Sequence, residues 1–157
     1  QVTLVPDGPD VITSCAGWET VKFQDYLKEI IIEFKEAGIR TSIFVDPKIE
    51  MIEGAKLCGT DRIELYTENY AKLYLKNAAN SIDPFIKAAN RANELGLGIN
   101  AGHDLSLDNL KFFSEKIGKT SFWEPTSQSH LATFKPWTTL KTRTLLGTFI
   151  SATRRSA

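Results

Sequence analysis

The sequence predicts an α/β protein built on parallel strands, which form a sheet or part of a barrel. Short apolar stretches alternate with longer ones in which apolar residues recur every three or four positions. Three of the longer stretches end at a glycine, namely Gly38, Gly59 and Gly96, shortly before the next apolar stretch. About four strand–helix units follow one another, which favours a parallel sheet or barrel. Four units make half of an eightfold barrel, so we expect two open sheet edges.

Four segments are predicted as strands because they are short, apolar and bounded by Gly, Pro or Asp. They are VTLVP, TSIFVD, RIELYT and GLGINAG, at residues 2–6, 41–46, 62–67 and 96–102. The predicted helices cover residues 20–34, 49–57, 71–95 and 105–117. The first of them begins at Glu19 or Thr20, and Ser106 is the expected N-cap of the last one.

Composition is that of an ordinary globular domain, with 157 residues of which 42% are hydrophobic and 24% charged. The 19 basic and 19 acidic residues balance, so nothing in the bulk charge predicts nucleic-acid or membrane partners. No apolar run approaches the roughly 20 residues of a membrane helix, and no signal peptide is visible. Cys15 and Cys58 have no metal or redox spacing, and we expect free, buried thiols in a cytoplasmic protein rather than a disulfide. His103, Asp104 and Asp108 lack a second histidine at ligand spacing, so no metal site is predicted.

Residues 119–157 differ in composition from residues 1–118. They contain 14 Ser or Thr among 39 residues and six Lys or Arg, but only one acidic residue, Glu124. No strand–helix alternation continues there. We therefore divide the chain into a half-barrel, residues 1–118, and a tail that is divergent, disordered or frame-disrupted. Since the sequence opens at Gln1 directly on an apolar strand, we also expect an upstream segment.

Candidate reactive residues lie where the predicted strands end, because those loops hold the active site in a parallel barrel. The polar side chains at these ends are Thr13, Ser14, Asp46, Glu64, Thr67 and His103. Thr13 and Ser14 lie in a loop and can hydrogen-bond a substrate. Asp46, which precedes a proline, is interpreted as a helix cap.

Glu64 and His103 carry the clearest chemical hypotheses. Strand alternation places Glu64 on one face with Arg62 and Tyr66, toward the barrel interior, where a carboxylate is costly unless it is paired or used. His103 follows a glycine at a strand end, where an imidazole can exchange protons near neutral pH. Structural alternatives remain open for both. Glu64 can be an ion-pair partner of Arg62 or an edge charge, and His103 a loop residue or a contact to the next helix.

Four stretches resemble the C-terminal half of the pyridoxine 5'-phosphate synthase family. They are LVPDGPDVITSCAGWET, RTSIFVDPKIEMIEGAKLCGTDRIELYTENYA, ANELGLGINAGHDL and LDNLKFF. The Leu-Val-Pro, Glu-x-Tyr-Thr and Asn-Ala-Gly-His motifs occur in the family's order and at its spacing. The resemblance covers residues 1 to about 118.

This resemblance implies a (β/α)8 barrel that acts on small phosphorylated substrates without a metal or organic cofactor. The implied reaction condenses 3-amino-2-oxopropyl phosphate with 1-deoxy-D-xylulose 5-phosphate and gives pyridoxine 5'-phosphate, phosphate and water. The motifs imply that His103 is the proton donor and that Glu64 stabilises charge in the transition state. Thr13 is an implied substrate contact, and Asp104 stands at a substrate-binding position where many members have glycine. The family also implies a homo-oligomer.

Two parts of the family pattern are not found in this sequence. One is the other half of the barrel with its general-base glutamate, and the second is a phosphate-binding Ile-Gly-His-Ala stretch after Gly118. We therefore expect a fragment that is inactive alone. The alternative is a non-catalytic half-barrel that associates through its open edges. A binding module that uses the basic tail is a third interpretation, which rests only on the six tail charges.

Overall fold

The computed structural model describes residues 1–7, 14–118 and 123–125. Within these ranges five parallel strands form one sheet in the order β1-β2-β3-β4-β5. The strands are β1 (Val2–Leu4), β2 (Thr41–Val45), β3 (Arg62–Leu65), β4 (Gly98–Ala101) and β5 (Trp123–Pro125). The helices are α1 (Gln24–Glu36), α2 (Ile49–Cys58), α3 (Glu68–Tyr74), α4 (Ala78–Glu94) and α5 (Leu110–Ile117). Sequential parallel strands linked through helices confirm the predicted α/β fold and are consistent with a partial barrel.

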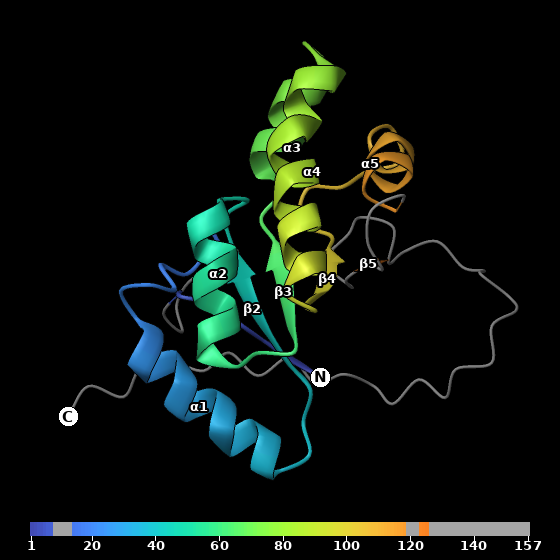
Figure 1. Ribbon diagram of the computed structural model, residues 1–157. Coiled ribbons are helices and arrows are strands. Elements are labelled where there is room, and N and C mark those ends of the chain that lie inside the picture. The colour runs from blue at the N-terminus through green and yellow to red at the C-terminus, as the bar shows by residue number, and fades with distance from the viewer. Residues whose placement is uncertain (8–13, 119–122, 126–157) are drawn as a thin grey trace, which may run out of the picture.

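One face of the sheet packs against the helices and forms the hydrophobic core. Helices α2 and α4 lie over this face (Figure 1), and α1, α3 and α5 also contribute buried side chains to the core. The strand residues in the core are those at alternate positions: Val2, Leu4, Ile43, Val45, Ile63, Leu65, Ile99 and Ala101. Period-two alternation therefore assigns the intervening residues to the opposite, interior face.

The interior face is polar, and its hydrogen bonds reach across intervening strands. Thr3 Oγ1 on β1 donates to Glu64 Oε2 on β3 at 3.0 Å, passing over β2. Asn100 Nδ2 on β4 donates to Ser42 Oγ on β2 at 3.3 Å, passing over β3. In a flat sheet strands two apart are separated by roughly 10 Å. These contacts indicate that the sheet curls toward its interior face, as a barrel wall does.

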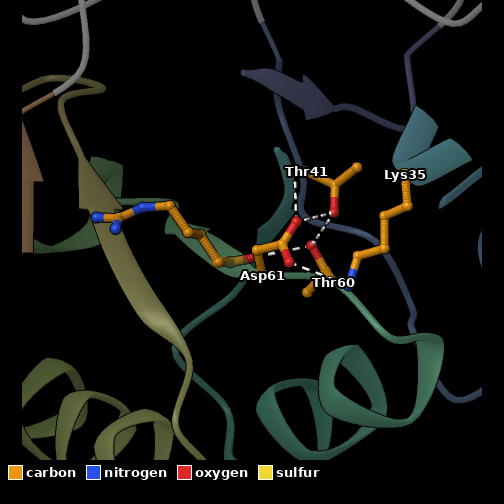
Figure 2. Close-up of polar contacts among 5 residues, drawn as sticks. Lys35, Thr41, Thr60 and Asp61 are labelled. Atoms are coloured by element: carbon orange, nitrogen blue, oxygen red, sulfur yellow. Dashed lines mark hydrogen bonds and ion pairs between the residues drawn. The ribbon is translucent and has the colours of Figure 1, made fainter. Parts of the chain in front are cut away.

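A polar cluster around Asp61 lies at the amino-terminal ends of β2 and β3. The amide and the hydroxyl of Thr41 donate to Asp61 Oδ2 at 2.8 and 2.9 Å. Lys35 Nζ lies 3.0 Å from Asp61 Oδ1, and the hydroxyl of Thr60 donates to that of Thr41 at 3.3 Å (Figure 2). The cluster ties the end of α1, the start of β2 and the loop before β3 together. Burial opposes ionisation of Asp61, but the hydrogen bonds from Thr41 and Lys35 outweigh it and hold the pKa of this carboxyl below its usual value.

Three predicted helices differ from those observed. The first begins at Gln24 instead of at Glu19 or Thr20. The stretch 71–95 forms two helices because Asn77 caps the start of α4, where its side chain accepts the Asn80 amide at 3.0 Å. The last helix begins at Leu110, and its N-cap is Asn109 rather than Ser106. In that turn the Ser106 amide donates to the Asn109 side chain at 2.8 Å.

Two further predictions about single residues were wrong. Asp46 does not cap α2, because the N-cap is Lys48 and Asp46 contributes only a backbone carbonyl and a 3.9 Å ion pair to it. Neither cysteine forms a disulfide, as predicted, but Cys15 is exposed and only Cys58 is buried. Burial raises the pKa of the Cys58 thiol to about 11, so this group remains a protonated core side chain.

Strand β5 lies in the segment where the sequence predicts no strand, and it pairs with β4. Residues 119–122 and 126–157, which make up the rest of the predicted tail, lie outside the described residues. No helix in the described part of the chain is both long enough and apolar enough to cross a membrane.

Replacing Asp61 with Asn is expected to lower the free energy of unfolding by about 1–3 kcal/mol, because Thr41 and Lys35 lose a charged acceptor. The folded-state pKa of Asp61 lies below the unfolded value, so its stabilisation is present above about pH 4 and is lost as pH falls through the folded pKa. Urea unfolding of both proteins at neutral and at acidic pH measures this difference. Asp83→Asn, on the exposed surface of α4, is the control. A difference that persists unchanged in acid would contradict the assignment.

Candidate active site

His103 lies in the turn that follows β4, and its ring packs against two aromatic side chains. The Tyr66 ring meets it edge-on, with centroids 5.1 Å apart, and the Phe44 ring centroid is 5.9 Å away. Phe44 and Tyr66 also contact each other at 5.3 Å. Only 13% of the His103 side chain is exposed. The imidazole is therefore held in a half-enclosed aromatic setting at the carboxyl ends of β2, β3 and β4.

The backbone of this turn is fixed by side chains from neighbouring elements. The hydroxyl of Thr67, a fully buried residue just after β3, donates to the His103 carbonyl. Asn109 Nδ2 donates to the Asp104 carbonyl at 3.3 Å. Tyr70 of α3 in turn donates its hydroxyl to the Asn109 carbonyl at 2.6 Å. The turn that carries the imidazole is thus anchored to the scaffold.

Glu64 points to the interior face, as strand alternation predicts. It is 3% exposed, and its register partners on the neighbouring strands are Phe44 and Asn100. Besides the hydrogen bond from Thr3, it shares this face with the buried Arg62, which donates from Nε to Asn100 Oδ1 at 2.7 Å. A carboxyl group buried in this way is costly unless it is hydrogen-bonded, and Thr3 supplies such a bond.

Charged groups lie next to the imidazole on the side of α3. The Glu68 carboxylate pairs with Lys72 Nζ at 2.8 Å. Lys72, and then Tyr66, lower the pKa of Glu68 through hydrogen bonds, and the nearby His103 adds to the effect. Burial, followed by the hydrogen-bonded Glu68 carboxylate, raises the pKa of the Tyr66 phenol. Tyr66 is therefore a neutral hydrogen donor beside the imidazole at physiological pH.

The structure thus places three of the predicted site residues, Glu64, His103 and Asp104, at one end of adjacent strands. Glu64 lies on β3 and His103 follows β4, with Tyr66, two residues after Glu64 on the same face, in contact with the imidazole. Ser14 is half-buried in the loop before α1. Thr13 lies outside the described residues. Within the described ranges, no three His, Cys, Asp or Glu residues gather as metal ligands would.

Comparison with known proteins bears on this arrangement. The family model described as pyridoxal phosphate biosynthesis protein PdxJ matches residues 1–121. The chain belongs to the PdxJ family. A relative from Flavobacterium johnsoniae, named pyridoxine 5'-phosphate synthase, is 68% identical over 117 residues, which cover 74% of this chain and 49% of the relative. Relatives of the same name from Christiangramia forsetii and Porphyromonas gingivalis are 61% and 54% identical over the same length.

Membership of the PdxJ family confirms the resemblance drawn from the motifs and agrees with the partial TIM barrel, the fold of this family. The chain spans about half the length of the curated relatives it matches. Curated relatives named as synthases place it in a family of biosynthetic enzymes.

Sequence reasoning did not identify the contacts that hold the two candidates in place. Phe44 could have been found, because it alternates with Ile43 and Val45 and therefore shares the interior face with Glu64. The contact between Thr67 and the His103 carbonyl joins residues 36 positions apart. No local pattern in the sequence predicts such a contact.

Replacing Thr67 with Val is expected to loosen the His103 turn, because the His103 carbonyl loses its buried donor. The free energy of unfolding should fall by about 1–2 kcal/mol, and backbone amides of the turn should exchange faster with deuterium. Thr67→Ser keeps the hydroxyl and is expected to retain slow exchange. Equal exchange rates in the two variants would exclude the hydrogen bond as the anchor.

Proposed function

We propose that this chain supplies the C-terminal half of a pyridoxine 5'-phosphate synthase. The reaction condenses 3-amino-2-oxopropyl phosphate with 1-deoxy-D-xylulose 5-phosphate and yields pyridoxine 5'-phosphate, phosphate and water. One observation carries the proposal: in a PdxJ-family chain, a buried glutamate faces the barrel interior and an anchored histidine follows the next strand. The remaining expectations belong to the same proposal: a cytoplasmic homo-oligomer, small phosphorylated substrates and no cofactor.

The proposed roles follow from the chemistry of the condensation. Forming an imine between an amine and a ketone, enolising it and expelling water all require proton transfers near neutral pH, for which imidazole is suited. In the proposal His103 donates a proton to the departing oxygen. Cationic imine intermediates gain from a fixed carboxylate in a site that excludes water, and Glu64 fills that role. The substrate phosphates suit backbone amides at the mouths of barrel loops.

The chain is proposed to be inactive by itself, since it spans about half of each relative. The test is a chimera in which residues 1–121 replace the matching segment of the Flavobacterium johnsoniae relative. The chimera is expected to form pyridoxine 5'-phosphate from the two substrates, and the isolated chain is not. A folded chimera without turnover would reject the proposed function. In that case, binding between this chain and the other half of the relative would favour the alternative of a non-catalytic association module.

Within the chimera, His103→Ala is expected to lower kcat by about 10²–10⁴-fold, because a positioned proton donor is lost. Glu64→Gln is expected to lower kcat by about 10²–10³-fold, because a neutral amide stabilises a cation poorly. Steady-state kinetics and circular dichroism separate loss of chemistry from loss of fold. Asp83→Asn on the exposed face of α4 is the control and should be fully active. Unimpaired turnover in either site variant removes that residue from the mechanism.

A further inference from the structure

We propose that Asp104 is a positioning residue for His103, and that its carboxylate accepts the Nδ1–H of the imidazole and leaves Nε2 to exchange protons with a substrate. The role in turnover rests on the proposed function. The assignment goes beyond it, because the family resemblance gives this position a substrate contact and no task for an acidic side chain.

The pairing follows from the distance between the two side chains and from their hydrogen-bonding capacity. Asp104 Oδ2 lies 2.5 Å from His103 Nδ1, which is within hydrogen-bond distance and shorter than the roughly 2.7–2.9 Å usual for a charge-assisted N–H···O bond. A carboxylate can only accept, so Nδ1 must carry the hydrogen. A neutral imidazole has a single N–H, and Nε2 is then the unprotonated nitrogen. Once Nε2 takes up a proton, the same carboxylate faces the resulting cation.

The backbone of Asp104 gives independent support. Its φ is +58°, and it is the one non-glycine residue with a positive φ in the described part of the chain. Glycine adopts this conformation without strain, whereas an L-residue with a side chain is disfavoured there. Aspartate is among the few L-residues that tolerate this region, at a cost that glycine does not incur, and non-glycine residues held there cluster at functional sites. A role for the Asp104 side chain, here its contact with His103, accounts for an aspartate at a position whose backbone suits glycine.

Other contacts confine the imidazole so that the carboxylate can orient it. Tyr66 meets the ring edge-on, and the tilted Phe44 ring packs against both of them. The hydroxyl of Thr67 fixes the His103 carbonyl, and Asn109 fixes that of Asp104. The donor and the acceptor of the pair thus sit on an anchored backbone, and the hydrogen bond between them selects the tautomer.

The first experiment reads the tautomer directly in this chain. The chain has two histidines, and His130→Gln assigns the ring signals to His103. At about pH 8, where imidazole is largely neutral, ¹⁵N shifts of the ring nitrogens are expected to show hydrogen on Nδ1. Asp104→Gly preserves the backbone conformation and removes the acceptor, so the hydrogen is expected to move to Nε2. Asp108→Asn, an exposed acid in the same segment, is the control and should leave the spectrum unchanged.

Hydrogen on Nε2 in the unmodified chain, or an unchanged spectrum in Asp104→Gly, would overturn the pairing. Because glycine suits this backbone, the melting temperature of Asp104→Gly should not fall, so misfolding does not account for a changed spectrum. The second readout is kinetic and uses the chimera. There, Asp104→Gly is expected to lower kcat on the order of 10²-fold with little change in KM, as misorientation of a catalytic group does. A change confined to KM would assign Asp104 to substrate binding instead.

The two readouts separate the inference from the function on which it rests. The ring spectra need no substrate and decide the pairing whether or not the chimera turns over. An inactive chimera therefore counts against the synthase assignment, while a wrong tautomer counts against Asp104.

Discussion

The structure depends on a curled sheet whose interior face is held by hydrogen bonds between strands that are not neighbours. Thr3 reaches Glu64 across β2, and Asn100 reaches Ser42 across β3. Each bond satisfies polar groups that the curvature buries, and an unsatisfied buried group of this kind costs about 1–3 kcal/mol. The curvature and these hydrogen bonds therefore depend on each other. A flatter sheet would separate the partners, and apolar residues at these positions would remove the bonds that hold the sheet curved.

The two ends of the strands in this curled sheet have different roles. At one end the Asp61 cluster connects α1, β2 and the loop before β3, and it contains only contacts that fix chain segments to each other. At the other end, Phe44 of β2 and Tyr66, just after β3, pack against the imidazole in the turn after β4. In parallel barrels the first end carries stability and the second carries chemistry. Glu64 lies between the interior layer and this second end. It accepts a hydrogen bond from Thr3 on the interior face, and Tyr66, two residues further along the same face, contacts His103.

The sequence was sufficient for features that have a local period. Alternation in RIELYT predicted that Glu64 faces the interior, and glycines marked the ends of α1, α2 and α4 correctly. The sequence was insufficient where a single side chain decides whether a helical stretch forms one helix or two. The stretch 71–95 has a helical period throughout, but Asn77 satisfies the first amides of α4 and thereby ends the preceding helix. Asp46 is of a residue type that often caps helices, yet the N-cap of α2 is Lys48, two residues later. The partners of Asp104 and Thr67 depend on the fold and on a positive φ, which no periodicity encodes.

Arg62 shows how closely the interior layer constrains its neighbours. Its guanidinium donates to the Ile99 carbonyl and to Asn100, each at 2.7 Å, and the side chain is 6% exposed. The register partner of Arg62 on β4 is Gly98, where an added Cβ would lie 2.4 Å from Arg62 Nη1 and 2.7 Å from Cζ. Glycine is favoured there by this close approach and not by backbone conformation, since its φ is not positive, and a larger residue would have to displace the Arg62 guanidinium from its hydrogen bonds. A buried cation in the barrel interior thus fixes both the amide that it binds and the missing side chain beside it. Three consecutive residues of β4, namely Gly98, Ile99 and Asn100, therefore contact or accommodate Arg62 just before the turn that carries His103.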